Sequence, residues 1–210
     1  MREINSKLIE GINNIYDLIV LNLYWILGFV LGLGIFGFIP STIAVTNILR
    51  NRHLKKDSSI SFFNYWKYYK QNFIKNNLYG LFLLGCIYLG FLYIQTLDNL
   101  DNVIKGPYIW LTYGIFICFI ILNLYILIVY IHFDFSFKMI LKHSLVFMIT
   151  CPIHTLLLIL IILISSWTVV RFPLYFPFIQ VSLFLFLISK IIFHAINVVT
   201  QVQNKRWINK

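Results

Sequence analysis

The stretch LIVLNLYWILGFVLGLGIFGFIPSTIAVTNIL, from Leu18 to Leu49, decides the fold because its 32 residues include no charged side chain. As one α-helix it would be about 48 Å long, whereas the hydrocarbon core of a bilayer is about 30 Å thick. It is therefore too long for one plain span and too short for two. Because a proline disfavours helix in the residue before it, the segment 36–42 around Pro40 predicts a break. We expect a first span over about 18–38 and a half-helix over about 41–50.

The rest of the chain is equally apolar. Mean hydropathy is +0.84, 60% of the 210 residues are hydrophobic and 11% are charged. Soluble domains carry about 25% charged residues, so lipid must be the solvent for most of this surface. Apolar runs predict further spans over about 76–97, 107–131, 144–166 and 174–198, with a kink at Pro152. The expected fold is all-α, a single integral membrane domain over 1–210 with five spans.

Two segments read as helices at the membrane surface. Residues 2–16 form a short amphipathic pattern that leads into the first span. Residues 60–75 place Phe62, Trp66, Tyr69 and Phe73 on one stripe, with lysines elsewhere. This pattern favours an interfacial helix whose lysines face the anionic lipid of one leaflet. A docking helix for a protein partner is the alternative.

The basic residues indicate the orientation, because short loops rich in Lys and Arg stay in the cytoplasm. With five spans, 50–77, 132–143 and the tail after Val199 lie on one side with twelve Lys and Arg, against four on the other. If residues 18–49 enter, break and return, the counts become fourteen against two. The charge bias therefore favours a broken hairpin, with both termini on the cytoplasmic side of the plasma membrane. Since these basic residues flank spans, we expect no nucleic-acid partner.

No catalytic, cofactor or metal pattern is recognisable, and we predict that the chain is not an enzyme. His132, Asp134 and His143 could gather at a metal, but pairing of Asp134 with Lys138, one helical turn later, is favoured. Inside the spans, His154 and Asn123 are expected to form interhelical hydrogen bonds. Lys190 is expected to extend to the cytoplasmic interface, next to His194.

Three stretches carry a resemblance to a known family. The first runs from Asn22 and Trp25 in LNLYW (21–25), through Gly37 and Pro40 in FGFIPSTIA (36–44), to Arg50. The second is FFNYWK (62–67), which contains Phe63, followed by Asn72 and Phe73. The third is FDFSFK (133–138), which contains Asp134, Ser136 and Lys138, followed by LK at 141–142.

In this order the stretches resemble the YesL family of bacterial multi-span membrane proteins, a domain of unknown function. His132 stands where that family commonly has Arg, and Ile39 where many members have Gly. The resemblance implies an inner-membrane protein of Gram-positive bacteria, encoded near sugar ABC transporters and polysaccharide-utilisation genes.

The leading functional hypothesis is accordingly a membrane protein that acts through protein or lipid contacts, as an accessory to carbohydrate uptake by a sugar ABC transporter. A small transporter or lipid-handling protein is the alternative, because interrupted helices often frame binding sites.

Overall fold

The computed structural model describes residues 2–54, 60–97 and 102–208, and within them it contains helices and no β-strand. Five of the helical segments are long and apolar enough to cross a membrane. The predicted all-α membrane fold with five apolar spans is therefore confirmed. The elements are α1 (Arg2–Leu31), α2 (Ile35–His53), α3 (Phe62–Lys70), α4 (Phe73–Leu97), α5 (Asn102–His132), α6 (Phe137–Thr150), α7 (Pro152–Arg171), the 3₁₀ turn η1 (Pro173–Tyr175), the π-helical turn η2 (Phe176–Gln180) and α8 (Val181–Ile208).

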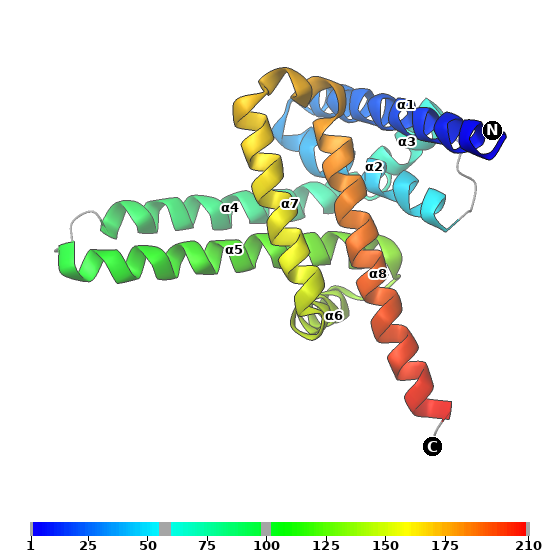
Figure 1. The fold of residues 1–210 in the computed structure, drawn as a ribbon. Coiled ribbons are helices and arrows are strands. Elements are labelled where there is room, and N and C mark those ends of the chain that lie inside the picture. The colour runs from blue at the N-terminus through cyan, green and yellow to red at the C-terminus, as the bar shows by residue number, and fades with distance from the viewer. Residues whose placement is uncertain (1, 55–59, 98–101, 209–210) are drawn as a thin grey trace.

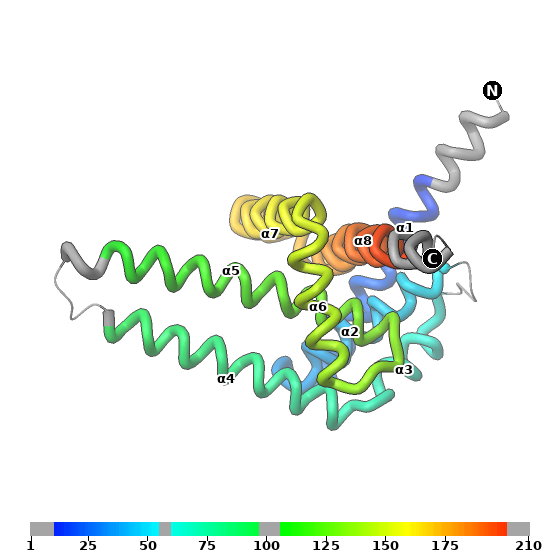
Figure 2. The backbone as a smooth tube through the Cα atoms, turned by 90° about the horizontal axis from the view of Figure 1, so that it is seen from below, coloured from blue at the N-terminus to red at the C-terminus, as the bar shows by residue number. Residues whose placement is uncertain are grey.

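Helix α2 is the centre of the arrangement. It packs against α1, α3, α4, α5 and α8 (Figure 1). The long hairpin of α4 and α5 reaches away to one side, and α7 and α8 run across its direction (Figures 1 and 2). Although α2 has 19 residues, it is not among the five apolar spans in the described chain, because polar residues interrupt it and its last turn carries Arg50, Arg52 and His53. Its middle also contains Ser41, Thr42 and Thr46, which are buried. Neighbouring helices, rather than lipid, enclose most of it from Ile39 to Leu49, whereas Ile35, Phe36 and Phe38 in its first turn are exposed.

The break in the first long stretch lies earlier than the sequence predicts. Helix α1 continues without interruption from the expected surface helix to Leu31, and the chain reverses at 32–34. Leu33 and Gly34 both have a positive φ, of 52° and 78°, and Gly34, with ψ of −78°, takes a turn conformation that glycine adopts at low cost. The interruption after the first span is thus confirmed, but the half-helix expected over 41–50 is the second part of a helix that begins at Ile35.

Gly37 and Pro40 have roles other than the expected break. Pro40 is the sixth residue of α2, where it lacks the N–H that would bond to the carbonyl of Phe36 and its ring crowds that carbonyl, yet the helix continues through it. Gly37 packs directly on α1: a Cβ added there would lie 2.4 Å from the carbonyl oxygen of Gly28. Small residues let two helix backbones approach closely in a membrane. The glycines therefore form the contact between α1 and α2.

Two other predicted helices are divided. The helix expected over 60–75 ends at Lys70, and Asn72, with φ of 56°, separates it from α4. The span expected over 144–166 is interrupted at Cys151, where α6 ends and α7 begins. Pro152 does not kink a continuous helix: it occupies the first turn of α7, where a missing N–H is tolerated, and it keeps Cys151 out of helical geometry.

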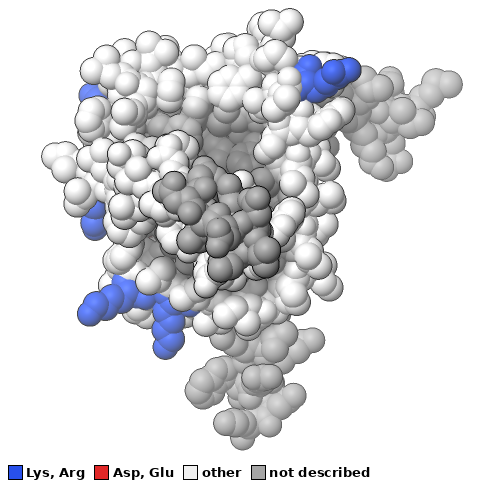
Figure 3. All heavy atoms as spheres, turned by 90° about the vertical axis from the view of Figure 1, so that its left-hand side faces the viewer, with Lys and Arg blue, Asp and Glu red and all other residues white. Residues whose placement is uncertain are grey.

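Apolar side chains form an interior and also cover much of the outer surface. One cluster joins α1, α2 and α3 around Trp25 and Tyr65, and a second joins α5 to α8 around Tyr125 and Ile192. Helices α4 and α7 expose most of their apolar side chains. Among the described residues, the face seen from the free end of the α4–α5 hairpin has basic residues only near its edge (Figure 3). Such a surface requires lipid or another apolar partner.

Candidate functional site

A polar cavity of about 430 Å³ lies where the three stretches that carry the family resemblance come together. It is bounded by the end of α2, the turn between α3 and α4, the end of α5 and the segment after α5. Nine of its lining residues have polar or charged side chains, and they come from all four of these segments: Asn47, Arg50, Asn51, Tyr68, Gln71, Asn72, Lys75, Tyr130 and Asp134. Ile43, Ile131, Phe133 and Phe135 complete the wall.

Arg50 is the half-buried cation of this pocket. Its Nη2 donates a hydrogen bond to the backbone oxygen of His132 at 3.2 Å, which ties α2 to the end of α5. Its Nε is buried and has no hydrogen-bond partner among the described residues. Because this Nε is not accessible, it is the rest of the Arg50 side chain that lines the cavity, and a guanidinium there can donate charge-assisted hydrogen bonds to an anionic ligand.

Amide and phenol groups hold the remaining walls in place. Asn51 Nδ2 donates to the hydroxyl of Tyr68 at 2.7 Å and thereby joins α2 to α3. Asn72 Nδ2 lies 3.4 Å from the hydroxyl of Tyr130, and that hydroxyl donates to Asn76 Oδ1 at 3.2 Å. The left-handed backbone of Asn72 places its side chain at the pocket, a local strain of the kind that often accompanies functional sites.

The charges of the pocket leave a net positive site. Lys75 and Asp134 are both exposed at the lining, opposite in sign, and Arg50 adds the second positive charge. Asp134 and Lys138 are both in the described part of the chain, and no ion pair joins them, so the pairing expected between them is wrong. Without that pairing, Asp134 is available at the pocket wall. The site can bind an anion and also accept a hydrogen bond from a neighbouring hydroxyl or amine.

Three of the residues singled out from the sequence line this pocket: Arg50, Asn72 and Asp134. Ser136 and Lys138 lie next to it, exposed, at the start of α6, and the Ser136 side chain makes no capping hydrogen bond. Phe63 points outward from α3, and Phe73 packs against the cluster of α1 to α3.

Asn22 and Trp25 are structural residues far from the pocket lining. Asn22 is fully buried; its Nδ2 donates to the backbone oxygens of Phe176 and Pro177 at 3.1 and 2.8 Å, and its Oδ1 accepts from the backbone N–H groups of Val181 and Ser182. One amide side chain thus provides hydrogen-bond partners for four backbone groups in and after the irregular turn before α8. Trp25 Nε1 donates to Thr42 Oγ1 at 3.1 Å and joins α1 to α2.

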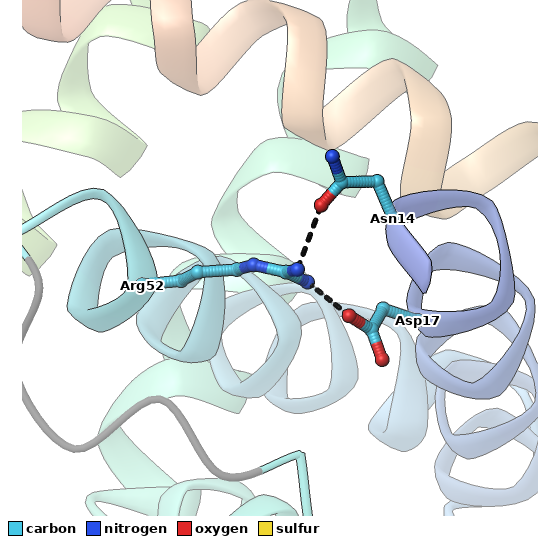
Figure 4. Close-up of polar contacts among 3 residues, drawn as sticks. All are labelled: Asn14, Asp17 and Arg52. Atoms are coloured by element: carbon cyan, nitrogen blue, oxygen red, sulfur yellow. Dashed lines mark hydrogen bonds and ion pairs between the residues drawn. The ribbon is translucent and has the colours of Figure 1, made fainter. Parts of the chain in front are cut away.

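A second basic residue of α2 closes the hairpin instead of entering the pocket. Arg52 Nη1 lies 2.6 Å from Asp17 Oδ2, and its Nη2 donates to Asn14 Oδ1 at 2.7 Å (Figure 4). The sequence analysis did not predict this ion pair. Arg50 and Arg52, two residues apart, therefore serve different purposes.

The α3 helix contributes two buried tyrosines to the hairpin. Tyr65 OH donates to Ser41 Oγ at 3.2 Å, and Tyr69 OH donates to the backbone oxygen of Gly28 at 3.0 Å. Burial raises the pKa of Tyr65 to about 12, and it also raises the pKa of Tyr69. Both hydroxyls are therefore neutral donors at ordinary pH, and they fix α3 against the closest part of the α1–α2 contact.

The expected interhelical hydrogen bonds are confirmed. His154 Nε2 and His194 Nδ1 lie 2.8 Å apart and join α7 to α8, and Asn123 accepts a hydrogen bond from Tyr79 between α5 and α4. The exposed Lys190 has its Nζ over the ring of Phe186, at 4.8 Å from the centroid. In the described part of the chain, no three His, Cys, Asp or Glu side chains form a group that could hold a metal ion.

Sequence reasoning missed most of the pocket's uncharged residues. Asn47, Arg50 and Asn51 are three and four residues apart, so they share one face of α2, and this spacing was a usable signal. Tyr68, Gln71 and Lys75 are also three and four residues apart, so they would share one face of the expected helix over 60–75. What the sequence did not reveal is that this face meets the end of α2 and the segment after α5.

Comparison with known proteins finds relatives without an assigned activity. The chain is similar to the uncharacterized protein YteU of Bacillus subtilis (strain 168), with 26% identity over 183 residues, which cover 86% of this chain and 81% of that protein. No solved structure matches the chain. Residues 18–94, from α1 through most of α4, match a family described as "Protein of unknown function, DUF624". The chain is thus similar, over α1 to α4, to a family whose function is not known.

Proposed function

We propose that this membrane protein acts by binding a small ligand with a negatively charged group in the polar pocket, rather than by catalysis. The observation that carries the proposal is the pocket lining, which combines the half-buried Arg50 and the exposed Lys75 with several side-chain amides. No lining residue forms a recognisable nucleophile–base pair, whereas cations and amides are the groups that bind anions.

The pocket is proposed to face the cytoplasm from the plasma membrane, with both chain termini on the same side. The α1–α2 hairpin supports this orientation, because Arg52 pairs with Asp17 and Asn14 near the beginning of the first apolar segment. The ends of α2 and α5 and the start of α4 then share the side that carries most of the Lys and Arg residues.

The resemblance to the YesL family adds a second candidate, an accessory role beside a sugar ABC transporter. Its support in the fold is Phe63, which is 78% exposed on α3 and does not line the pocket. A photo-crosslinking amino acid at position 63 should capture a transporter subunit in intact cells. Capture of lipid alone, or of nothing, would remove this candidate and leave ligand binding intact.

Native mass spectrometry of the full chain in a nonionic detergent tests the ligand-binding proposal. We expect the wild-type protein to retain a bound adduct that Arg50→Gln and Lys75→Gln lose. Lys67→Gln is the matched control, because Lys67 is exposed on α3 and does not line the cavity. Since Lys75 is exposed, its loss does not threaten folding. Identical adduct spectra for the wild type and both pocket variants would refute the proposal.

A further inference from the structure

We infer that the ligand of this pocket is the phosphate-bearing headgroup of an anionic phospholipid. The inference rests on the proposed ligand-binding function and adds the chemical class of the ligand and its route of entry. Three observations support it: the depth of the pocket, its charges, and the apolar surface beside it.

The pocket lies at the level where two spans meet the membrane surface. The apolar span of α4 begins at Phe73, and the pocket residues Asn72 and Lys75 flank that start. The apolar span of α5 ends at His132, and the pocket residues Tyr130 and Phe133 flank that end. Side chains at the end of a span lie at headgroup depth. Lipid phosphates occupy this depth at high local concentration, so a cationic pocket there meets them first.

The charges suit a phosphate diester that carries a hydroxyl or amine. Arg50 presents a planar guanidinium, the group that best matches phosphate oxygens, and Lys75 adds a flexible cation. Asp134 repels a bare anion but accepts a hydrogen bond from a headgroup hydroxyl. The volume of about 430 Å³ is at the lower end for ligand sites, which suits a headgroup without its acyl chains.

The acyl chains have an apolar path directly beside the pocket. Ile74 and Leu78 are 84% and 68% exposed, and they lie four residues apart on one stripe of α4, next to Lys75. The stripe continues at Phe82, which is 61% exposed, into the part of α4 that has few contacts within the protein. A lipid can therefore place its phosphate in the pocket while its chains remain along α4.

The test is lipid titration of the purified full chain by native mass spectrometry, with phosphatidylglycerol, phosphatidylcholine and soluble sn-glycerol 3-phosphate as separate probes. We expect phosphatidylglycerol to bind about tenfold more tightly than phosphatidylcholine, because its single negative charge complements the net positive charge of the pocket. Arg50→Gln and Lys75→Gln should each weaken phosphatidylglycerol about tenfold, the effect of one charge-assisted hydrogen bond. Lys67→Gln should change it less than about twofold, because Lys67 does not line the cavity and acts only as a surface charge.

Each other outcome decides the matter. If sn-glycerol 3-phosphate binds through Arg50 and displaces phosphatidylglycerol at equal concentration, the ligand is a soluble phosphate; the lipid inference then fails and the proposed function stands. If Lys67→Gln weakens phosphatidylglycerol as much as Arg50→Gln does, the lipid follows general surface charge and the inference fails. If neither pocket variant affects any probe, the proposed function and the inference fail together.

Discussion

Substitution of Gly37 by Ala tests the close contact between α1 and α2. The added Cβ would lie 2.4 Å from Gly28 O and 2.6 and 2.7 Å from the O and Cα atoms of Phe29. A carbon atom normally stays about 3.3 Å or more from a carbonyl oxygen, so α2 would have to move by roughly 1 Å. All three clashing atoms belong to the backbone of α1, so no side-chain rotation can relieve them.

The cost has two parts. Overpacking of a tight contact costs about 1–3 kcal/mol. Movement of α2 also weakens two buried hydrogen bonds, from Trp25 to Thr42 and from Tyr65 to Ser41, each of which contributes about 1 kcal/mol. We expect a total of about 3 kcal/mol or more, and a melting temperature lower by roughly 6–12 °C for a chain of this size.

Thermal unfolding in one detergent, with Gly85→Ala as the control, measures the effect. Gly85 is an exposed glycine of α4, and a Cβ added there meets no atom within 4 Å. That variant should be as stable as the wild type or gain up to about 1 kcal/mol from helix propensity. If Gly37→Ala and Gly85→Ala melt together, the backbones of α1 and α2 do not approach as closely as described, and the account of the hairpin is refuted.

Three further predictions concern the same hairpin. Arg52→Gln should destabilise by about 1 kcal/mol or less, because its ion pair with Asp17 is partly exposed, and the difference from the wild type in chemical denaturation should shrink at high salt. Folding raises the pKa of Tyr65 from 10.0 to about 12, so the neutral Tyr65 stabilises the folded protein fully below pH 10, and this stabilisation is lost as the pH rises towards 12. The melting temperature of Tyr65→Phe should therefore depend less on pH between 10 and 12 than that of the wild type. An unchanged pH dependence would contradict the burial of the Tyr65 hydroxyl. Single cysteines in a background without Cys86, Cys118 and Cys151, placed by Asn13→Cys and Leu54→Cys, should react with a membrane-impermeant maleimide from the same side of the membrane, whereas labelling from opposite sides would exclude the hairpin.

The sequence predicted the class and the number of spans because both depend on composition and length. A run of apolar residues without charge has few alternatives to a membrane helix, whichever neighbours it meets. The interruption after the first span was also readable, from a length that fits neither one span nor two. These features are local, and they do not require knowledge of which helices touch.

The positions of the interruptions were harder to predict, because several residues could cause each one. Pro40 is a strong helix breaker in isolation, yet it is tolerated near the start of α2, while Leu33 and Gly34 make the reversal. At Pro152 the reverse holds: a proline expected to kink a helix begins a new one. The choice depends on tertiary contacts, such as the fit of Gly37 against Gly28, that residue types do not reveal.

The pocket was predictable only in part. Arg50, Asn72 and Asp134 were singled out by resemblance, from three stretches far apart in the chain, and the fold brings them to one cavity. Their convergence requires the reversal before Ile35 and the turn at Asn72, neither of which was placed correctly beforehand. An error of a few residues in a break thus hides a site, although every contributing residue type is visible.

The enclosure of α2 has a consequence for how the protein is made. When α2 leaves the ribosome, α1 is the only partner already synthesised, since α3, α4, α5 and α8 follow it in the chain. The glycine contact and the pair of Arg52 with Asp17 involve α1 alone, so they can form at that stage. These two contacts can cover part of α2, which is less apolar than the five spans, before α8 is synthesised. The contacts of α2 with α1 can therefore form before its contacts with α3, α4, α5 and α8.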